Sequence, residues 1–148
     1  MTPIRRLDHV AIVVRDTTAA LAHFSGRLGL QVIHEEELSS PPVRLTYLDT
    51  GNAFLQLVEP LDDGSELAQW LDVHGEGLHH LCFGVDDVGA AVDALSDRSA
   101  GPRLLGEGRG RRSGFVADGA RHGVVIECTE FRREDDVDRT PGWLSDGH

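Results

Sequence analysis

The hydrophobic and polar positions of the chain follow two different periods. Short apolar runs rich in Val, Ile, Leu and Phe stand between turn residues, which is typical of buried strands. Two segments, beginning at Thr17 and at Val88, instead place small and apolar residues three and four positions apart, which predicts amphipathic helices. Asp16 and Asp87 directly precede these segments and are expected to cap them. The pattern favours a fold of the α+β class.

Eight strands are expected, four in each half of the chain. They cover residues 8–14, 30–37, 43–49 and 53–58 in the first half, and 78–85, 103–105, 114–117 and 124–129 in the second. The linker between the halves is expected to hold a short helix over Glu66–Val73. The Gly- and Arg-rich stretch Gly106–Gly114 is expected to be a loop, and the charged tail after Phe131 is expected to fray.

The two halves repeat each other at one fixed offset. LDHVAIVVRD (Leu7–Asp16) aligns with LHHLCFGVDD (Leu78–Asp87) at an offset of 71 residues. This alignment places His9 on His80. The predicted helix after each segment keeps the same offset, so the match extends beyond a single motif.

The far end of each half supports the same offset. FLQLVEP (Phe54–Pro60) falls on VIECTEF (Val125–Phe131), and Gln56 falls on Glu127. The first pair of strands alone determines the offset, so the agreement of the second pair is independent support. Each half is therefore predicted to be a βαβββ module.

We expect the 148 residues to form a single domain built from these two modules. The modules cover about 7–60 and 77–131, with a linker at 61–76 and a flexible tail at 132–148. Neither module is large enough to bury a core by itself. The two are therefore expected to pair into a curved sheet that forms a cleft and carries flanking helices.

Equivalent strands of paired modules should turn equivalent positions toward that cleft. His9 and His80 come from the first strand of each module, and Gln56 and Glu127 come from the last. Two imidazoles, an amide oxygen and a carboxylate suit a divalent first-row metal ion. A metal ion would also remove the cost of burying Gln56 and Glu127 among apolar residues. On the residues alone, core histidines and a solvent-facing glutamine remain the alternative.

The same segments carry a resemblance to a known family. LDHVAIVVRD, EPLDDGSELAQWL, GEGLHHLCFGVDD and GVVIECTE resemble the vicinal oxygen chelate (glyoxalase/bleomycin resistance/dioxygenase) superfamily over about Leu7–Glu130. Within it, the methylmalonyl-CoA epimerase group is the nearest likeness. The resemblance implies a divalent metal (Co, Mn, Ni or Zn) on His9, Gln56, His80 and Glu127. It also implies a homodimer and a small-molecule substrate such as an acyl-CoA thioester.

The resemblance further implies a metal-dependent epimerase or isomerase that removes a proton alpha to a carbonyl. Glu127 would be the catalytic base on one face of the carbon. Length matching places Arg44 where the family carries a second carboxylate, and arginine cannot act as a base at neutral pH. Three accounts follow: another acid such as Glu36, Glu37 or Glu59 substitutes, one base suffices, or Arg44 binds the anionic group of a different substrate.

One further histidine and a group of arginines complete the expected site. His79, on the opposite face of its strand from His80, should face away from the metal and donate a hydrogen bond. Arg112, with Arg109 and Arg111, is expected to bind phosphate groups of the substrate, with surface arginines as the alternative.

Other functions on the same scaffold remain open. A glyoxalase-type lyase acting on a thiol adduct of an aldehyde is the main alternative. An extradiol dioxygenase would use His9, His80 and Glu127 as an Fe(II) triad, but Gln56 as a fourth ligand and the short chain count against it. A non-catalytic drug-binding module would lack the four ligands altogether.

Composition and charge exclude several classes of binding partner. The formal net charge of −11 argues against nucleic acid, which requires a basic face. No apolar run approaches the roughly 20 residues of a membrane span, and the N-terminal residues have no signal-peptide pattern. A cytoplasmic protein with no membrane partner is therefore expected. Cys82 and Cys128 stand in apolar runs without a C-x-x-C motif, which predicts buried thiols.

Overall fold

The structure is a computed structural model that describes residues 4–96, 105–117, 119–132 and 134. Its elements in chain order are β1 (Ile4–Val13), α1 (Thr17–Leu21), the π-helical segment η1 (Ala22–Arg27), β2 (Gln31–Ser39), β3 (Pro42–Asp49), β4 (Phe54–Pro60), α2 (Glu66–His74), β5 (Gly77–Val85), α3 (Val88–Leu95), β6 (Leu105–Gly108), β7 (Arg111–Phe115) and β8 (Val125–Glu130). Each half contributes a strand, a helical segment and three further strands. The predicted α+β fold of two paired βαβββ units is therefore confirmed.

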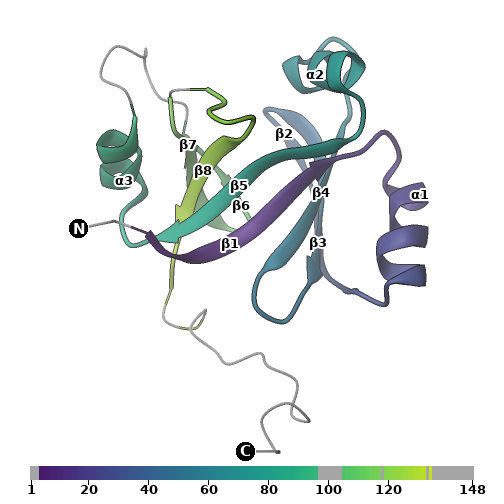
Figure 1. The fold of residues 1–148 in the computed structure, drawn as a ribbon, viewed down its shortest axis with the longest axis horizontal. Coiled ribbons are helices and arrows are strands. Elements are labelled where there is room, and N and C mark those ends of the chain that lie inside the picture. Colours follow the sequence, from purple (N-terminus) through teal and green to yellow (C-terminus); the bar gives the residue numbers. More distant parts are fainter. Residues whose placement is uncertain (1–3, 97–104, 118, 133, 135–148) are drawn as a thin grey trace, which may run out of the picture.

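All eight strands belong to one sheet, in the order β2–β3–β4–β1–β5–β8–β7–β6. The first strands of the two modules, β1 and β5, pair antiparallel at its centre. Each of them pairs in parallel with the last strand of its own module, β4 or β8. The sheet is strongly curled, and β1 and β5 cross its middle side by side (Figure 1).

Helices of the two modules cover equivalent parts of one sheet face, which we call the outer face. Under α1 and η1, the fully buried side chains of Leu48 and Leu57 pack against Phe24. Val92 of α3 and Val85 of β5 are fully buried in a second apolar cluster. The two helices lie on opposite sides of the molecule (Figure 1). Both halves are therefore held by similar helix-on-sheet packing.

The helices begin where the sequence predicts. Asp16 Oδ1 accepts hydrogen bonds from the backbone N–H groups of Thr18 and Ala19 at 2.9 and 3.3 Å. Asp87 Oδ1 accepts from Ala90 N–H at 3.0 Å. Both predicted N-caps are therefore confirmed. None of the helices in the described part of the chain is long and apolar enough to cross a membrane.

The Gly- and Arg-rich stretch is a hairpin, so the predicted loop at Gly106–Gly114 is wrong. β6 and β7 pair from Leu105–Gly114 to Gly108–Arg111. Arg109 and Gly110 form the turn in the left-handed region, with φ of 53° and 69°. Residues 103 and 104, which were predicted to begin a strand, lie outside the described residues, as does nearly all of the predicted tail.

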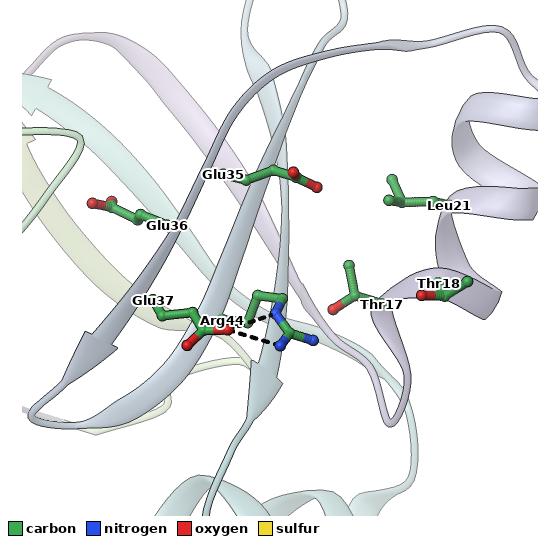
Figure 2. Close-up of a pocket in the computed structure, with 7 residues that line it drawn as sticks. All are labelled: Thr17, Thr18, Leu21, Glu35, Glu36, Glu37 and Arg44. Atoms are coloured by element: carbon green, nitrogen blue, oxygen red, sulfur yellow. Dashed lines mark hydrogen bonds and ion pairs between the residues drawn. The ribbon is translucent and has the colours of Figure 1, made fainter.

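The outer face of β2 and β3 carries acidic side chains and one arginine beside α1. Arg44 Nη2 and Nε donate to Glu37 Oε1 at 2.8 and 3.2 Å. Glu59 Oε1 accepts from the backbone N–H and the hydroxyl of Thr17 at 2.8 and 2.7 Å. A hollow of about 380 Å³ opens here (Figure 2), lined by Thr17, Thr18, Leu21, Glu35, Glu37, Arg44 and Glu36, although the side chain of Glu36 points away from α1.

Candidate metal centre

His9, His80 and Glu127 come together where β1, β5 and β8 lie side by side. The Nε2 atoms of His9 and His80 each lie 3.2 Å from Glu127 Oε1. One ligand atom from each residue lies within 4.8 Å of the others. Both imidazoles are almost completely buried, and 12% of the Glu127 side chain is exposed. Three of the four residues aligned by the repeat therefore converge.

Gln56 lies on the same face of the sheet, directly opposite Tyr47 in the β3–β4 ladder. We call this face, which carries His9, Tyr47, Gln56, His80 and Glu127, the inner face. Gln56 Nε2 donates to Tyr47 Oη at 2.8 Å, so the amide oxygen Oε1 is not used in this hydrogen bond and can act as a ligand.

Three ligand atoms of this group have no hydrogen-bond partner. Among the described residues, Gln56 Oε1, His9 Nε2 and His80 Nε2 are all buried without one, and the contacts of the histidines to Glu127 are close but do not meet hydrogen-bond geometry. Such buried atoms are uncommon and costly. A cation held beside Glu127 would satisfy both imidazole nitrogens, and Gln56 Oε1 is a further buried oxygen on the same face, so the residues present fit a divalent metal ion.

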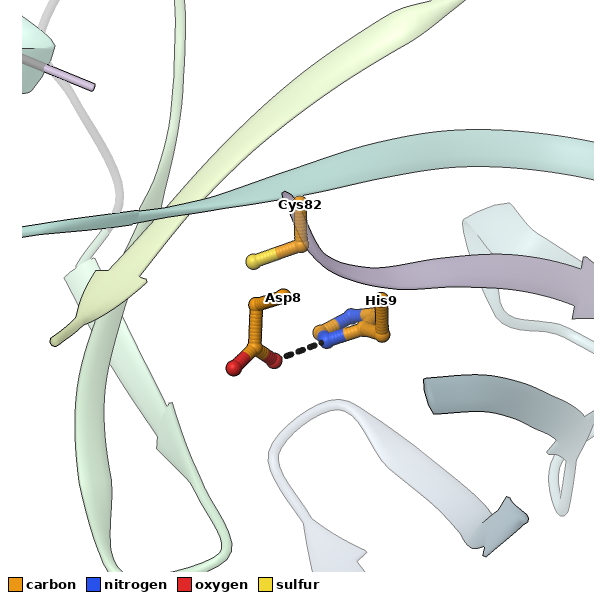
Figure 3. A group of neighbouring side chains, drawn as sticks. All are labelled: Asp8, His9 and Cys82. Atoms are coloured by element: carbon orange, nitrogen blue, oxygen red, sulfur yellow. Dashed lines mark hydrogen bonds and ion pairs between the residues drawn. The ribbon is translucent and has the colours of Figure 1, made fainter. Parts of the chain in front are cut away.

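A bulge in β1 explains how two neighbouring residues are both buried at this centre. Leu7 pairs with Phe83 and His9 pairs with Cys82, so Asp8 is an extra residue in the ladder. Asp8 is 4% exposed and His9 is 3% exposed, whereas regular alternation would bury only one of them. His9 Nδ1 lies 2.7 Å from Asp8 Oδ2 and donates its hydrogen there, because an ionised carboxylate can only accept (Figure 3).

Cys82 lies beside this pair, and its thiol, with Asp8 and His9, forms a second close group of ligand-type atoms (Figure 3). Asp8 is already engaged by His9 Nδ1 and by Arg109. Burial and the carboxylate of Glu127 raise the pKa of the Cys82 thiol well above its usual value. Cys82 is therefore a buried neutral thiol, and Cys128 is likewise buried and free, as predicted.

Charge at the centre is balanced by these contacts. Burial acts to raise the pKa of Glu127, but His80 and His9 outweigh it and hold that pKa well below its usual range. Burial acts to lower the pKa of His9, but Asp8 and Glu127 outweigh it and raise that pKa. Glu127 is therefore an anionic carboxylate at neutral pH, which is the form that binds a cation.

His79 contacts the far side of His80. The two Nδ1 atoms lie 2.7 Å apart. Burial, with the adjacent His80, lowers the pKa of His79 to about 4, so its ring is neutral at pH 7. The tautomers of the two rings set the direction of this contact: a cation on His80 Nε2 would leave the hydrogen on His80 Nδ1, and His79 Nδ1 would then accept it. Trp70 of α2 packs against His79, with ring centroids 4.9 Å apart.

The structure places the two predicted substrate-binding arginines away from this group. Arg44 lies on the outer face with Glu37 and α1 (Figure 2). Arg112 is exposed on β7, where the alternate residue Gly114 faces α3 and its neighbour Phe115 faces His80. Neither guanidinium is on the inner face.

Arg109, one of the three arginines expected to bind phosphate, does reach the inner face. Its Nη2 donates to Asp8 Oδ1 and Oδ2 at 2.9 and 2.7 Å. The guanidinium lies 5.0 Å from the centre of the Tyr47 ring and 4.8 Å from that of Phe54. Only 11% of its side chain is exposed. No signal in the one-dimensional pattern separates Arg109 from Arg111 or Arg112.

Glu36 is a further inner-face carboxylate. It pairs opposite Leu45 in the β2–β3 ladder, and its Oε1 accepts from the backbone N–H of Arg109 at 2.7 Å. Both Tyr47 Oη and Glu36 Oε1 lie close to Gly108. A side chain at this position would bring its Cβ to 3.1 Å from Tyr47 Oη and 3.6 Å from Glu36 Oε1. Glu36 thus lies across Tyr47 from Gln56.

Comparison with known proteins decides the family. Residues 8–117 match the family model described as Glyoxalase/Bleomycin resistance protein/Dioxygenase superfamily. The chain belongs to this superfamily. The matched range includes both histidines of the centre, and three of the four aligned ligand positions. The resemblance inferred from the sequence motifs is therefore confirmed.

Relatives of this superfamily member share most of its length. It is 38% identical over 106 residues to an ethylmalonyl-CoA/methylmalonyl-CoA epimerase of Cereibacter sphaeroides, covering 71% of this chain and 78% of the relative. The crystal structure of methylmalonyl-CoA epimerase from Mycobacterium tuberculosis matches with a TM-score of 0.77 at 30% identity, covering 90% of this chain and 93% of that one.

A third relative carries a bound ligand. A variant of Streptomyces coelicolor methylmalonyl-CoA epimerase in complex with 2-nitronate-propionyl-CoA matches with a TM-score of 0.75 at 30% identity, covering 86% of this chain and 97% of that one. Within the superfamily, the chain is therefore similar to methylmalonyl-CoA epimerases in both sequence and fold.

Proposed function

We propose that this protein is a metal-dependent epimerase that moves a proton alpha to the carbonyl of an acyl-CoA thioester, methylmalonyl-CoA or a close analogue. The observation that carries the proposal is the convergence of His9 Nε2 and His80 Nε2 on the carboxylate of Glu127, with the buried oxygen of Gln56 on the same face of the sheet. The similarity to epimerases over most of the chain supports the reaction class. The expected homodimer and cytoplasmic location stay predictions.

His9, Gln56, His80 and Glu127 would hold the cation. Two imidazoles, one amide oxygen and one carboxylate suit Co, Mn, Ni or Zn, so availability rather than the donor set would select the metal. A bound divalent cation would act as a Lewis acid on the substrate carbonyl and make the alpha proton more acidic.

Glu127 is proposed to take the proton on one face of the carbon. It is a carboxylate that can accept a proton, it lies beside the proposed cation, and only 12% of its side chain is exposed to water. Inversion at carbon also requires a proton donor on the opposite face. Glu36 is proposed for that role, because it projects from the other module onto the same inner face and lies next to Tyr47.

Solvent-deuterium exchange tests the proposal directly. One epimer of methylmalonyl-CoA is incubated in D₂O with the Co²⁺-loaded protein, and deuterium incorporation and epimer ratio are followed together. We expect both to change with the wild-type protein, and neither to change after removal of the metal with a chelator. A loaded protein that incorporates no deuterium into this substrate or into related 2-substituted malonyl thioesters would refute the epimerase.

Three variants separate the two proposed proton-transfer groups. Glu127→Gln should abolish exchange while the fold is retained. Glu36→Gln should still exchange the proton of one epimer but should lose epimerisation, because the second face is no longer served. Glu37→Gln, whose side chain is on the outer face with Arg44, is the matched control and should behave as wild type. Full epimerisation by Glu36→Gln would show that the second proton comes from elsewhere.

A further inference from the structure

We propose that Arg109 of the second module positions His9 of the first module for metal binding, and that it acts through Asp8. The proposal rests on the metal centre proposed above, but not on the epimerase reaction. It joins three contacts into one chain: guanidinium to carboxylate, carboxylate to imidazole, and imidazole to the cation site.

The contact between Arg109 and Asp8 spans the two modules. Nη2 donates to both oxygens of Asp8, at 2.9 and 2.7 Å, and one of these oxygens accepts from His9 Nδ1 at 2.7 Å. Asp8 is 4% exposed, so little water competes for it. A carboxylate held in this way fixes the ring orientation and the tautomer of a metal-binding histidine.

The hairpin places Arg109 by contacts on several sides. Its guanidinium packs on the rings of Tyr47 and Phe54, and its backbone N–H donates to Glu36 Oε1 at 2.7 Å. Its φ of 53° lies in the left-handed region, which a side chain other than that of glycine rarely adopts. The close approach of Gly108 to Tyr47 Oη allows the turn to sit this near the sheet. The backbone therefore adopts an uncommon conformation here, and the contacts to Asp8, Tyr47 and Phe54 hold the side chain on the inner face.

A positioning role and a purely electrostatic role of Arg109 predict opposite effects of its removal on metal affinity. A guanidinium near a cation repels it, so removal of the charge alone would strengthen metal binding. Loss of orientation at His9 would weaken it. The direction of the change in metal affinity therefore distinguishes the positioning role of Arg109 from a purely electrostatic one.

Metal affinity is measured by titrating Co²⁺ into the metal-free protein against a chromophoric chelator, with the visible spectrum of the Co²⁺ complex recorded in parallel. Arg109→Met should weaken Co²⁺ binding about 10- to 100-fold and alter the spectrum, because the geometry at His9 is no longer fixed. Arg109→Lys keeps the charge but loses the planar group and should fall between. Arg112→Met, an exposed arginine of the same hairpin, is the control and should leave the Co²⁺ affinity unchanged.

Arg109→Gly separates a general loss of stability from loss of positioning. Glycine adopts the left-handed turn without strain, so this variant should fold even if Arg109→Met does not. It should weaken Co²⁺ binding as much as Arg109→Met, since both lack the guanidinium. Unchanged or tighter Co²⁺ binding in Arg109→Gly would overturn the proposal.

The route through Asp8 is tested by a double-mutant cycle. In an Asp8→Ala background, adding Arg109→Gly should change the Co²⁺ affinity by less than twofold, because the contact is already gone. Additive losses would refute the route. Wild-type protein that binds no Co²⁺ would refute the metal centre itself, whereas normal Co²⁺ binding without epimerisation would refute only the proposed reaction.

Discussion

The hydroxyl of Tyr47 should decide which end of the Gln56 amide faces the cation, and Tyr47→Phe tests this. Tyr47 is 2% exposed and Gln56 is 4% exposed, so water cannot replace a lost partner. Phenylalanine keeps the ring that packs against His9 and Arg109 and removes only the oxygen that accepts from Gln56 Nε2.

Two effects of different size follow from this change. The buried Nε2 donor loses its partner, which should lower the free energy of unfolding by about 1–3 kcal/mol. The amide also loses about 1 kcal/mol of preference for the orientation that presents Oε1, which corresponds to about a fivefold loss of metal affinity. Urea unfolding of the metal-free protein measures the first effect, and Co²⁺ titration measures the second.

Gln56→Leu supplies the background that isolates the hydrogen bond. In that variant the Tyr47 hydroxyl has already lost its donor, so adding Tyr47→Phe should cost little or even stabilise the protein. If Tyr47→Phe instead leaves both the unfolding free energy and the Co²⁺ affinity of the otherwise wild-type protein unchanged, the amide is oriented by something other than this hydroxyl.

Three further predictions concern the ion and the scaffold. Free Co²⁺ at 100 times its dissociation constant should raise the free energy of unfolding by about 2.7 kcal/mol, and a chelator should reverse this; the same gain in His80→Ala would contradict the site. Leu57→Ala, at a fully buried outer-face position, should lower the free energy of urea unfolding by about 2–5 kcal/mol without changing the Co²⁺ affinity. A loss of Co²⁺ affinity in this variant would show that outer-face packing and the inner-face site are coupled. Asp16→Ala should lower the free energy of unfolding by about 1 kcal/mol, and Asp16→Asn should lower it much less because asparagine can also cap the helix. Equal losses in the two variants would show that the Asp16 side chain does not act as the N-cap of α1.

The internal repeat carried most of what could be predicted from the sequence. A fixed offset identified the equivalent strands, and equivalent strands of paired modules must present equivalent positions to the space between them. This is why His9 and His80 could be matched without knowledge of the fold. The placement of Arg44 could also have been inferred, because Val43, Leu45 and Tyr47 alternate with it and are buried on the inner face.

Other features could not be predicted from local pattern. The bulge that buries both Asp8 and His9 depends on how β1 meets β5, which is a long-range pairing. The position of Arg109 depends on a hairpin tip from one module packing on Tyr47 of the other. A Gly-rich stretch also satisfies loop and hairpin patterns equally well, and the pairing with β8 decides in favour of the hairpin. In each case a contact between distant segments fixes the structure.

The ladder that joins the two modules is also the least regular one in the sheet. β1 and β5 shift register three times, whereas β3 and β4 pair without interruption from Val43 to Asp49. An ion held by one imidazole from each of these central strands would cross-link the modules at this joint. Amide hydrogens of β1 and β5 should then exchange more slowly once the ion is bound, while those of α1 keep their rate. Loading of the ion would thus set how far the two halves can separate.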